Sequence, residues 1–185
     1  MTTQKIKKGR MLLAEPFMLD PNFRRAVILL CEHEMDGSLG FILNKPLEMT
    51  VNELIADFPE FDAPVFYGGP VQTDTIHYIH NSGDLLEGSK RIGKDVFWGG
   101  NFDQLKTLIK SGLIESSDIR FFVGYAGWDF GQLEEEMKMR SWVVARMEAN
   151  YIFKNKIKKL WQDVMRKKGD AYSVIAQMSE TTVSN

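Results

Sequence analysis

"RFFVGYAGWDFGQLEEEMK", residues Arg120 to Lys138, joins a hydrophobic run to an acidic segment through glycine-rich chain. With Ile119 before it, the first part reads "IRFFVGYA", a β-branched and aromatic run that predicts a central strand. Glycines follow at 124, 127 and 131, and they permit positive φ or close backbone approach. The stretch therefore predicts a strand that turns sharply into a helix.

The bend itself has two interpretations. Asp129 and Gln132 predict a helix cap before "LEEEMKM", and Trp128 can plug a tight packing turn. An anion cradle is disfavoured, because the first helical turns carry acidic residues that would repel a phosphate. A nucleophile elbow needs Ser or Cys where Trp128 or Asp129 stands. The other interpretation is a pocket for a ligand or partner, walled by Tyr125, Trp128 and Gln132.

A second glycine loop, Gly68-Gly69-Pro70, is a further part of this candidate site. It lies between two predicted strands and can present backbone groups to a ligand. The candidate ligand- or partner-binding residues are Gly68, Gly69, Pro70, Tyr125, Gly127, Trp128 and Gln132.

The rest of the chain predicts an α+β domain. The continuous apolar run "RRAVILLCEHE", residues 24–34, indicates a strand buried on both faces. The Asp-Gly turn after it returns "LGFILN", residues 39–44, as an antiparallel partner. Further strands are predicted at Met11–Ala14, 64–67, 76–80, 94–100 and 141–147, and helices at Val51–Phe58, 101–112 and Tyr151–Lys168.

Composition restricts the class of protein. The 185 residues carry a formal charge of −2, which argues against a protein that coats phosphate backbones. Cys31 is the single cysteine, so no internal disulfide is possible. The longest apolar run, residues 26–31, is too short to span a bilayer, and the first residues lack the pattern of a signal peptide. We expect a soluble cytoplasmic protein.

Four separated segments resemble the YqgE/AlgH family of bacterial proteins, in the family's order and spacing. They are "DPNFRRAVILLCEHEMDGSLGFILNKP" (20–46), "VFYGGPVQ" (65–72), "VFWGGNFDQL" (96–105) and "GYAGWDFGQLEEEM" (124–137). The resemblance extends over residues 9–175 and departs in "TDTIHYIHN", just after the second segment. It implies a compact α+β fold with a barrel-like sheet in the bacterial cytosol. Some members have been called transcriptional regulators, and a thiol-based role has been suggested.

With this resemblance, we predict one domain over residues 9–178, between flexible segments 1–8 and 179–185. Its sheet is expected to be mixed, mostly antiparallel and barrel-like, with helices packed on it.

Cys31 and His33 are the candidates for covalent chemistry. Two residues apart on a strand, they are expected on the same face, with Cβ atoms about 7 Å apart. A protonated His33 would then favour the Cys31 thiolate. A lone cysteine in an apolar run is more often a small buried hydrophobe. A hydrolase would also need an acid to orient His33 and donors for an oxyanion, for which Gly68 and Gly69 are the candidates.

No metal or cofactor site is predicted. His77 and His80 are three residues apart, on opposite faces of a predicted strand, and no zinc spacing occurs. The predicted terminal helix carries Lys154, Lys156, Lys158, Lys159, Arg166, Lys167 and Lys168. Such a basic face can bind nucleic acid, anionic lipid or an acidic partner, although it is usually solvated. No segment reads as a helix-turn-helix.

The leading hypothesis is a non-enzymatic binding or regulatory protein, a monomer or weak dimer that recognises an unknown protein or small molecule. One alternative is a thiol-dependent redox sensor or enzyme that uses Cys31. The other is a nucleic-acid-binding regulator that uses the terminal basic helix.

Overall fold

A computed structural model of the chain describes residues 4–154 and 157–178. Its sheet contains β1 (Arg10–Ala14), β2 (Val27–Glu34), β3 (Gly37–Ile42), β4 (Pro46–Thr50), β5 (Pro64–Tyr67), β6 (Val71–His80), β7 (Lys90–Gly93), β8 (Val96–Trp98), β9 (Ile119–Asp129) and β10 (Trp142–Arg146). The helices are α1 (Val51–Leu54), α2 (Phe102–Lys110), α3 (Gln132–Lys138), α4 (Asn150–Phe153), α5 (Leu160–Arg166) and α6 (Asp170–Ala176), with 3-10 turns at Ser116–Asp118 and Ile157–Lys159. The predicted α+β fold is confirmed.

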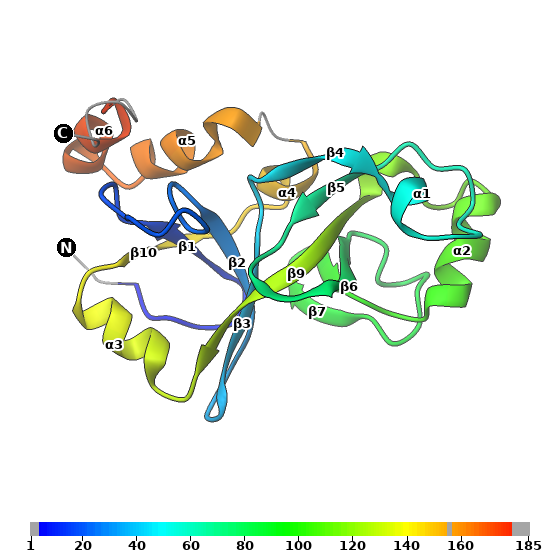
Figure 1. Ribbon diagram of the computed structural model, residues 1–185, viewed down its shortest axis with the longest axis horizontal. Coiled ribbons are helices and arrows are strands. Elements are labelled where there is room, and N and C mark those ends of the chain that lie inside the picture. The colour runs from blue at the N-terminus through cyan, green and yellow to red at the C-terminus, as the bar shows by residue number, and fades with distance from the viewer. Residues whose placement is uncertain (1–3, 155–156, 179–185) are drawn as a thin grey trace.

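Strand β9 joins the two halves of the molecule (Figure 1). It pairs antiparallel with β3 and β6 and parallel with β5, which makes the sheet mixed but mostly antiparallel, as predicted. The strand order is β10-β1-β2-β3-β9-β6-β8-β7, and β4 and β5 lie off this path. The eleven residues of β9 are long enough to contact β5 at one end and β3 at the other along the same edge.

The sheet curls like a barrel without closing. β7 and β10 end the path and do not pair. They nevertheless come into contact, since a Cβ added at Gly93 would lie 2.6 Å from the Met147 methyl carbon. Gly9 approaches the Ile92 carbonyl oxygen equally closely. The chain just after β10 and just before β1 therefore lies against β7 where strand pairing is absent.

The helices cover both faces of the curled sheet. α4, α5 and α6 pack on the cluster that fills its interior, which contains Cys31 and Phe41. α3 packs on the opposite face, together with Trp128 and Trp142. α1 and α2 lie in the other half of the molecule, beside β4 and β5 (Figure 1).

The predicted single helix over 151–168 is wrong, because α4 ends at Phe153 and α5 begins at Leu160. The Arg120 guanidinium donates to the Phe153 carbonyl oxygen (2.7 Å) at the end of α4. Residues 155–156 lie outside the described residues. An apolar stripe of α5 is buried, and its Trp161 donates its Nε1–H to the Ala14 carbonyl oxygen.

The first helix is shorter than the predicted Val51–Phe58. A Thr50–Glu53 capping box stands at its start, where the Glu53 carboxylate accepts from the Thr50 N–H. The Asn52 amide then donates to the Phe58 and Pro59 carbonyl oxygens, and this holds the following chain in an irregular loop. β4, β7 and α6 were not predicted.

Of the segments predicted to be flexible, residues 1–3 and 179–185 lie outside the described residues. In the remainder, Ile6 packs against the cluster on the α3 side, and the Gln4 side chain accepts from Arg10. Among the described residues, no helix combines the length and hydrophobicity needed to cross a membrane.

Candidate functional site

Trp128 is buried inside the bend, with 6% of its surface exposed. Its ring meets Trp142 edge to face, with ring centroids 5.9 Å apart. Both indole N–H groups donate to one carboxylate oxygen of Glu136, at 2.9 Å from Trp128 and 2.7 Å from Trp142. Sequence reasoning missed Glu136, because it stands in a run of three glutamates and only the fold selects it. This geometry supports the packing-turn interpretation.

Gln132 ties the bend to the start of α3. Its side-chain oxygen accepts from the Asp129 N–H at 3.0 Å, and its amide donates to Glu136 at 3.2 Å. The N-cap itself is Gly131, with a φ of 74°. The predicted cap residue Asp129 therefore lies two positions too early, although Gln132 reaches it as expected.

Tyr125 and Gly127 lie on the opposite face of β9 from Trp128, because side chains alternate along a strand. The Tyr125 ring contacts His77 edge to face at 5.9 Å. It also lies over Gly127, where an added Cβ would be 3.2 Å from the ring. Tyr125 and Trp128 consequently do not wall one pocket together.

Gly68 and Gly69 are buried where their segment crosses β9. A Cβ added at Gly69 would lie 2.2 Å from the Tyr125 carbonyl carbon, so glycine is required there for backbone contact. The Gly68 N–H donates to Val123, and the Gly68 carbonyl oxygen accepts from Ile42. These groups hold the crossing together and do not form an oxyanion site. Of this loop, Pro70 is the exposed residue.

The expectation that Cys31 and His33 share a face is wrong. The register of β2 against β3 shifts between Leu30 and Glu32, so Cys31 is the extra residue of a β-bulge. The bulge breaks the alternation of side chains. Cys31 points into the interior cluster, whereas His33 pairs with Ser38 and contacts α3 on the other face.

The Cys31 thiol is enclosed, with 1% of the residue exposed. Burial strongly raises the pKa of this thiol, and the charge of Glu32 raises it further, against a smaller opposite effect of Lys8. The thiolate, which is the reactive species, is therefore strongly disfavoured.

We expect the native Cys31 thiol to react with a small alkylating reagent at least about 10³-fold more slowly than in the unfolded chain, because reaction must wait for unfolding. The measurement follows labelling by mass spectrometry against pH, with and without denaturant. His33→Ala should leave the native rate unchanged, because the two side chains lie on opposite faces. A Met35→Cys variant supplies the exposed control, which should label rapidly under the same conditions. Fast native labelling of Cys31 that depends on His33 would restore the redox hypothesis.

His33 belongs to a different site, an open pocket of about 440 Å³ between the β2–β3 hairpin and the β9–α3 turn. We call it the hairpin pocket. Met35 and Phe130 stand in its lining with 86% and 76% of their surface exposed. Glu34 and Glu134 also line it. Of the residues singled out from the sequence, His33 alone lines this pocket, and the pattern gave no signal for Met35 or Phe130.

Ser38, His33 and Glu134 form a polar chain in the hairpin pocket. The Ser38 hydroxyl is 2.8 Å from His33 Nδ1, and Glu134 Oε1 is 3.6 Å from His33 Nε2. The order resembles a hydrolase triad, but Ser38 lies within a strand paired on both sides. In α/β-hydrolases the nucleophile instead sits on a sharp turn that exposes its hydroxyl. The chain fastens the hairpin to α3.

His77 and His80 are structural. His80 is fully buried, accepts from the Ser82 N–H through Nδ1 and donates to the Gly99 carbonyl oxygen through Nε2 (2.8 Å). Burial lowers the pKa of both imidazoles, which favours their neutral forms. In the part of the chain that the structure describes, no group of three or more His, Cys, Asp or Glu side chains is placed to hold a metal ion.

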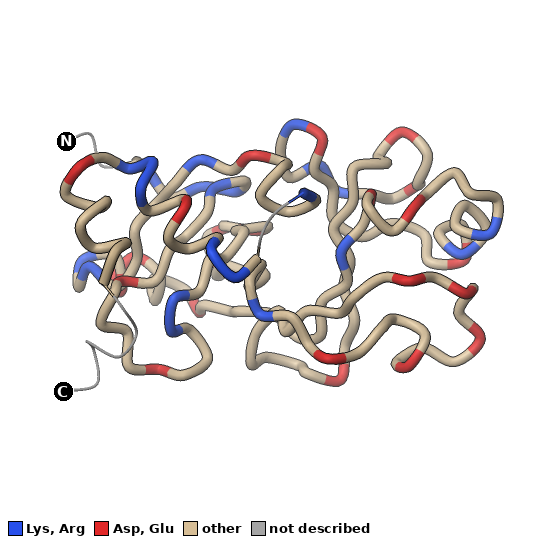
Figure 2. Tube along the Cα trace, turned by 90° about the horizontal axis from the view of Figure 1, so that it is seen from above, with Lys and Arg blue, Asp and Glu red and all other residues tan. Residues whose placement is uncertain are grey.

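Charge is unevenly divided between the two halves of the molecule (Figure 2). Residues 46–120, which form the half with α1 and α2, contain twelve acidic and six basic residues, a formal charge of −6. The rest of the chain contains thirteen acidic and seventeen basic residues, a charge of +4. Part of the predicted basic face is used internally, since the Lys168 ammonium donates to the Val144 carbonyl oxygen.

The family described as AlgH-like matches residues 11–173 of this chain. A UPF0301 protein of Chlorobaculum tepidum is 46% identical over 175 residues, which cover 95% of this chain and 94% of the relative. A UPF0301 protein of Cytophaga hutchinsonii is 38% identical over 172 residues, covering 92% and 94%. The chain therefore belongs to the AlgH-like family, as its four segments predicted.

Solved structures agree with this assignment. The solution structure of the AlgH protein from Pseudomonas aeruginosa has 26% sequence identity and a TM-score of 0.74, and the match covers 95% of this chain and 98% of that one. The crystal structure of protein DIP2367 from Corynebacterium diphtheriae has 23% identity and a TM-score of 0.82 over 96% and 95% of the two chains, which shows the same fold.

Proposed function

We propose that this chain is a non-enzymatic binding protein of the bacterial cytosol that recognises a protein partner through the hairpin pocket. The proposal is based on exposed apolar side chains. Met35 and Phe130 are largely exposed to solvent, although both line a concave site. Large apolar residues gathered at one place on a surface mark an interaction site, and Met and Phe are enriched at protein interfaces.

The polar groups of the pocket indicate what the partner looks like. Glu34 and Glu134 line the pocket with His33, and Asp36 lies in the same hairpin. A complementary partner presents an apolar side chain flanked by Lys or Arg, since opposite charges at the rim favour encounter and set the orientation. This differs from the site first hypothesised, because the glycine loop at Gly68 and Gly69 is occupied by backbone packing.

A regulatory role through protein contact is also part of the proposal. Direct reading of DNA receives less support, because the basic segment is divided into α4 and α5 and belongs to a chain with a net charge of −2. A thiol-based role receives less support, because Cys31 is buried and points to the opposite face of β2 from His33.

The test places a photo-crosslinking amino acid at Phe130 of the full chain and irradiates living bacteria that express it. We expect defined adducts with one or few proteins, identified by mass spectrometry. Leu113 is a matched control, since it is an exposed large apolar residue (58%) in the other half of the molecule. Adducts at Phe130 should be absent at Leu113.

Charge reversal then tests the stated chemistry. Glu134→Lys should remove the Phe130 adducts while leaving the melting temperature nearly unchanged, because surface ion pairs contribute little to stability. An adduct of twice the chain mass would show that the partner at this surface is a second copy of the chain. Equal adducts at Phe130 and Leu113 would contradict the proposal.

A further inference from the structure

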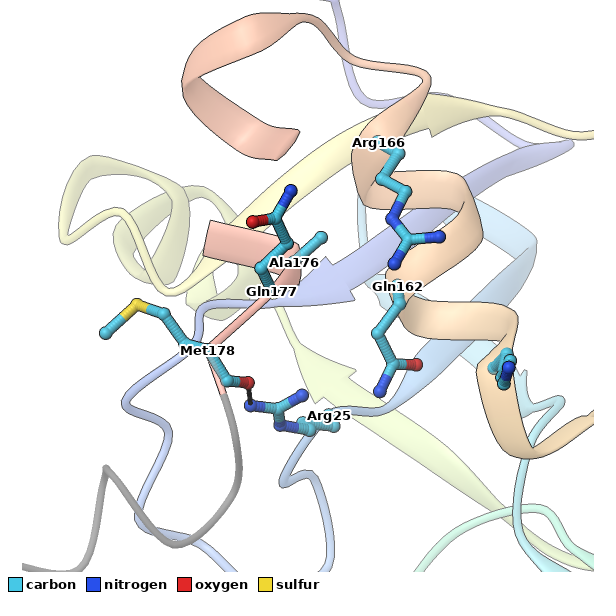
Figure 3. Close-up of a pocket in the computed structure, with 7 residues that line it drawn as sticks. Arg25, Gln162, Arg166, Ala176, Gln177 and Met178 are labelled. Atoms are coloured by element: carbon cyan, nitrogen blue, oxygen red, sulfur yellow. Dashed lines mark hydrogen bonds between the residues drawn. The ribbon is translucent and has the colours of Figure 1, made fainter. Parts of the chain in front are cut away.

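A second cavity, of about 370 Å³, shares none of its described lining residues with the hairpin pocket. It is bounded by the chain before β2, by α5 and by the end of α6 (Figure 3). Three cationic side chains line it, Arg25, Lys159 and Arg166, with the Gln162 amide between them. No acidic residue is among the described residues that line it. We call this cavity the basic pocket.

Arg25 forms a fixed wall of the basic pocket. Its residue is 93% buried by the chain around it, with 7% exposed, and its guanidinium lies 4.7 Å from the centre of the Trp161 ring. The same guanidinium donates to the Met178 carbonyl oxygen at the end of α6 (Figure 3). Cation–π stacking and the hydrogen bond hold the Arg25 guanidinium in one position.

The other three side chains come from one column of α5 and the turn before it. Lys159, Gln162 and Arg166 follow the spacing i, i+3, i+7, so they share one helical face. Lys159 and Arg166 are exposed, and Gln162 is half-buried between them. Asp163 lies 3.8 Å from one Arg166 nitrogen, a long and exposed ion pair that contributes little.

The long-range electrostatic field of the protein favours an anion at the basic pocket. The half that contains the basic pocket carries the +4 share of the formal charge, and the half with −6 lies across the molecule (Figure 2). Such a separation of charge directs small anions toward the positive half.

We propose that the basic pocket binds the phosphate group of a small phosphorylated ligand. A phosphate monoester carries a charge of about −1.5 to −2 at pH 7, which the positive charges of Lys159 and Arg166 can balance. Guanidinium groups form paired hydrogen bonds with phosphate oxygens, and ammonium and amide groups supply further donors. The cavity volume falls within the range of small-molecule sites, so it accommodates more than the phosphate group alone.

Isothermal titration calorimetry of the full chain near neutral pH tests the proposal with four probes: adenosine 5′-monophosphate, ribose 5-phosphate, inorganic phosphate and adenosine. We expect the phosphate-bearing probes to bind at one site per chain and to weaken as salt is added, whereas adenosine does not bind. Tighter binding of either phosphomonoester than of inorganic phosphate identifies a phosphorylated small molecule. Equal binding identifies free phosphate. Absence of binding by all probes at millimolar concentrations overturns the proposal.

Variants of α5 locate the site. Lys159→Gln and Arg166→Gln should each raise the dissociation constant about tenfold, the effect of losing one charge-assisted hydrogen bond. Gln162→Glu should weaken it more, because it adds a negative charge inside the basic pocket without removing a cation. All three side chains are exposed or half-buried, so these variants keep the fold.

Lys158→Gln is the matched control, since Lys158 is exposed in the same turn and does not line the basic pocket. It should leave the affinity unchanged. Equal losses from Lys158→Gln and Lys159→Gln would show diffuse attraction to a basic surface and would overturn the assigned site. Unchanged affinity in Gln162→Glu would do the same.

Discussion

Replacing Trp128 with alanine is expected to lower the free energy of unfolding by about 3–5 kcal/mol, the range for emptying a buried aromatic site. The side chain fills the bend between β9 and α3, packs on Trp142 and shares the Glu136 carboxylate with it. The loss is a large fraction of the stability of an ordinary domain, about 5–15 kcal/mol. Urea unfolding followed by circular dichroism measures it.

Trp128→Phe separates packing from hydrogen bonding. It keeps an aromatic ring in the bend and removes only the N–H donor and part of the volume, so about 1–2 kcal/mol should be lost. If Trp128→Ala unfolds at the same urea concentration as the wild type, the side chain is not a structural plug. The bend would then regain its interpretation as a binding surface.

Gly69→Ala is expected to destabilise the protein by about 2–6 kcal/mol, because backbone strain and overpacking act together. Gly69 has a φ of 155°, and a Cβ there would lie 2.2–2.3 Å from backbone atoms of Tyr125 and Ala126. Backbone atoms in a central strand cannot move aside as a flexible side chain can. The yield of soluble protein and its unfolding midpoint are the measurements.

Gly112→Ala is the matched control. Gly112 has a φ of 75°, but a Cβ there would meet nothing within 4 Å. The free energy of unfolding of this variant should therefore fall only by the cost of a left-handed conformation, about 1–2 kcal/mol. A Gly69→Ala variant no less stable than Gly112→Ala would show that the crossing at β9 is not tightly packed.

Local chemistry explains what could be predicted of the fold. The run at Arg120–Lys138 gave a central strand, a bend and a helix, because β-branched residues, glycines and a capping side chain act within a few residues. Predicted elements failed where a distant group intervened. Arg120 donates to the Phe153 carbonyl oxygen at the end of α4, and no local pattern near Phe153 contains that information.

The candidate site was harder to predict, because a site depends on which faces meet. Strand periodicity placed Cys31 and His33 on one face, and a single bulge residue separates them. The glycines at 68 and 69 were predicted to present backbone groups to a ligand, yet they are required by the backbone of β9 beside them. Glu136 has the same local signature as Glu135, but it alone accepts from two indoles.

By itself the sequence determined the family and the α+β class, since these follow from the order of motifs and from local periodicity. Tertiary structure decided which side chains share a surface. Arg25 lies more than 130 residues before Lys159 in the sequence, and the packing of α5 on the sheet makes them neighbours in the basic pocket. Met35 and Phe130 meet in the same way through the pairing of β3 with β9. Register and packing depend on the free energy of the whole core, which no short stretch of sequence contains.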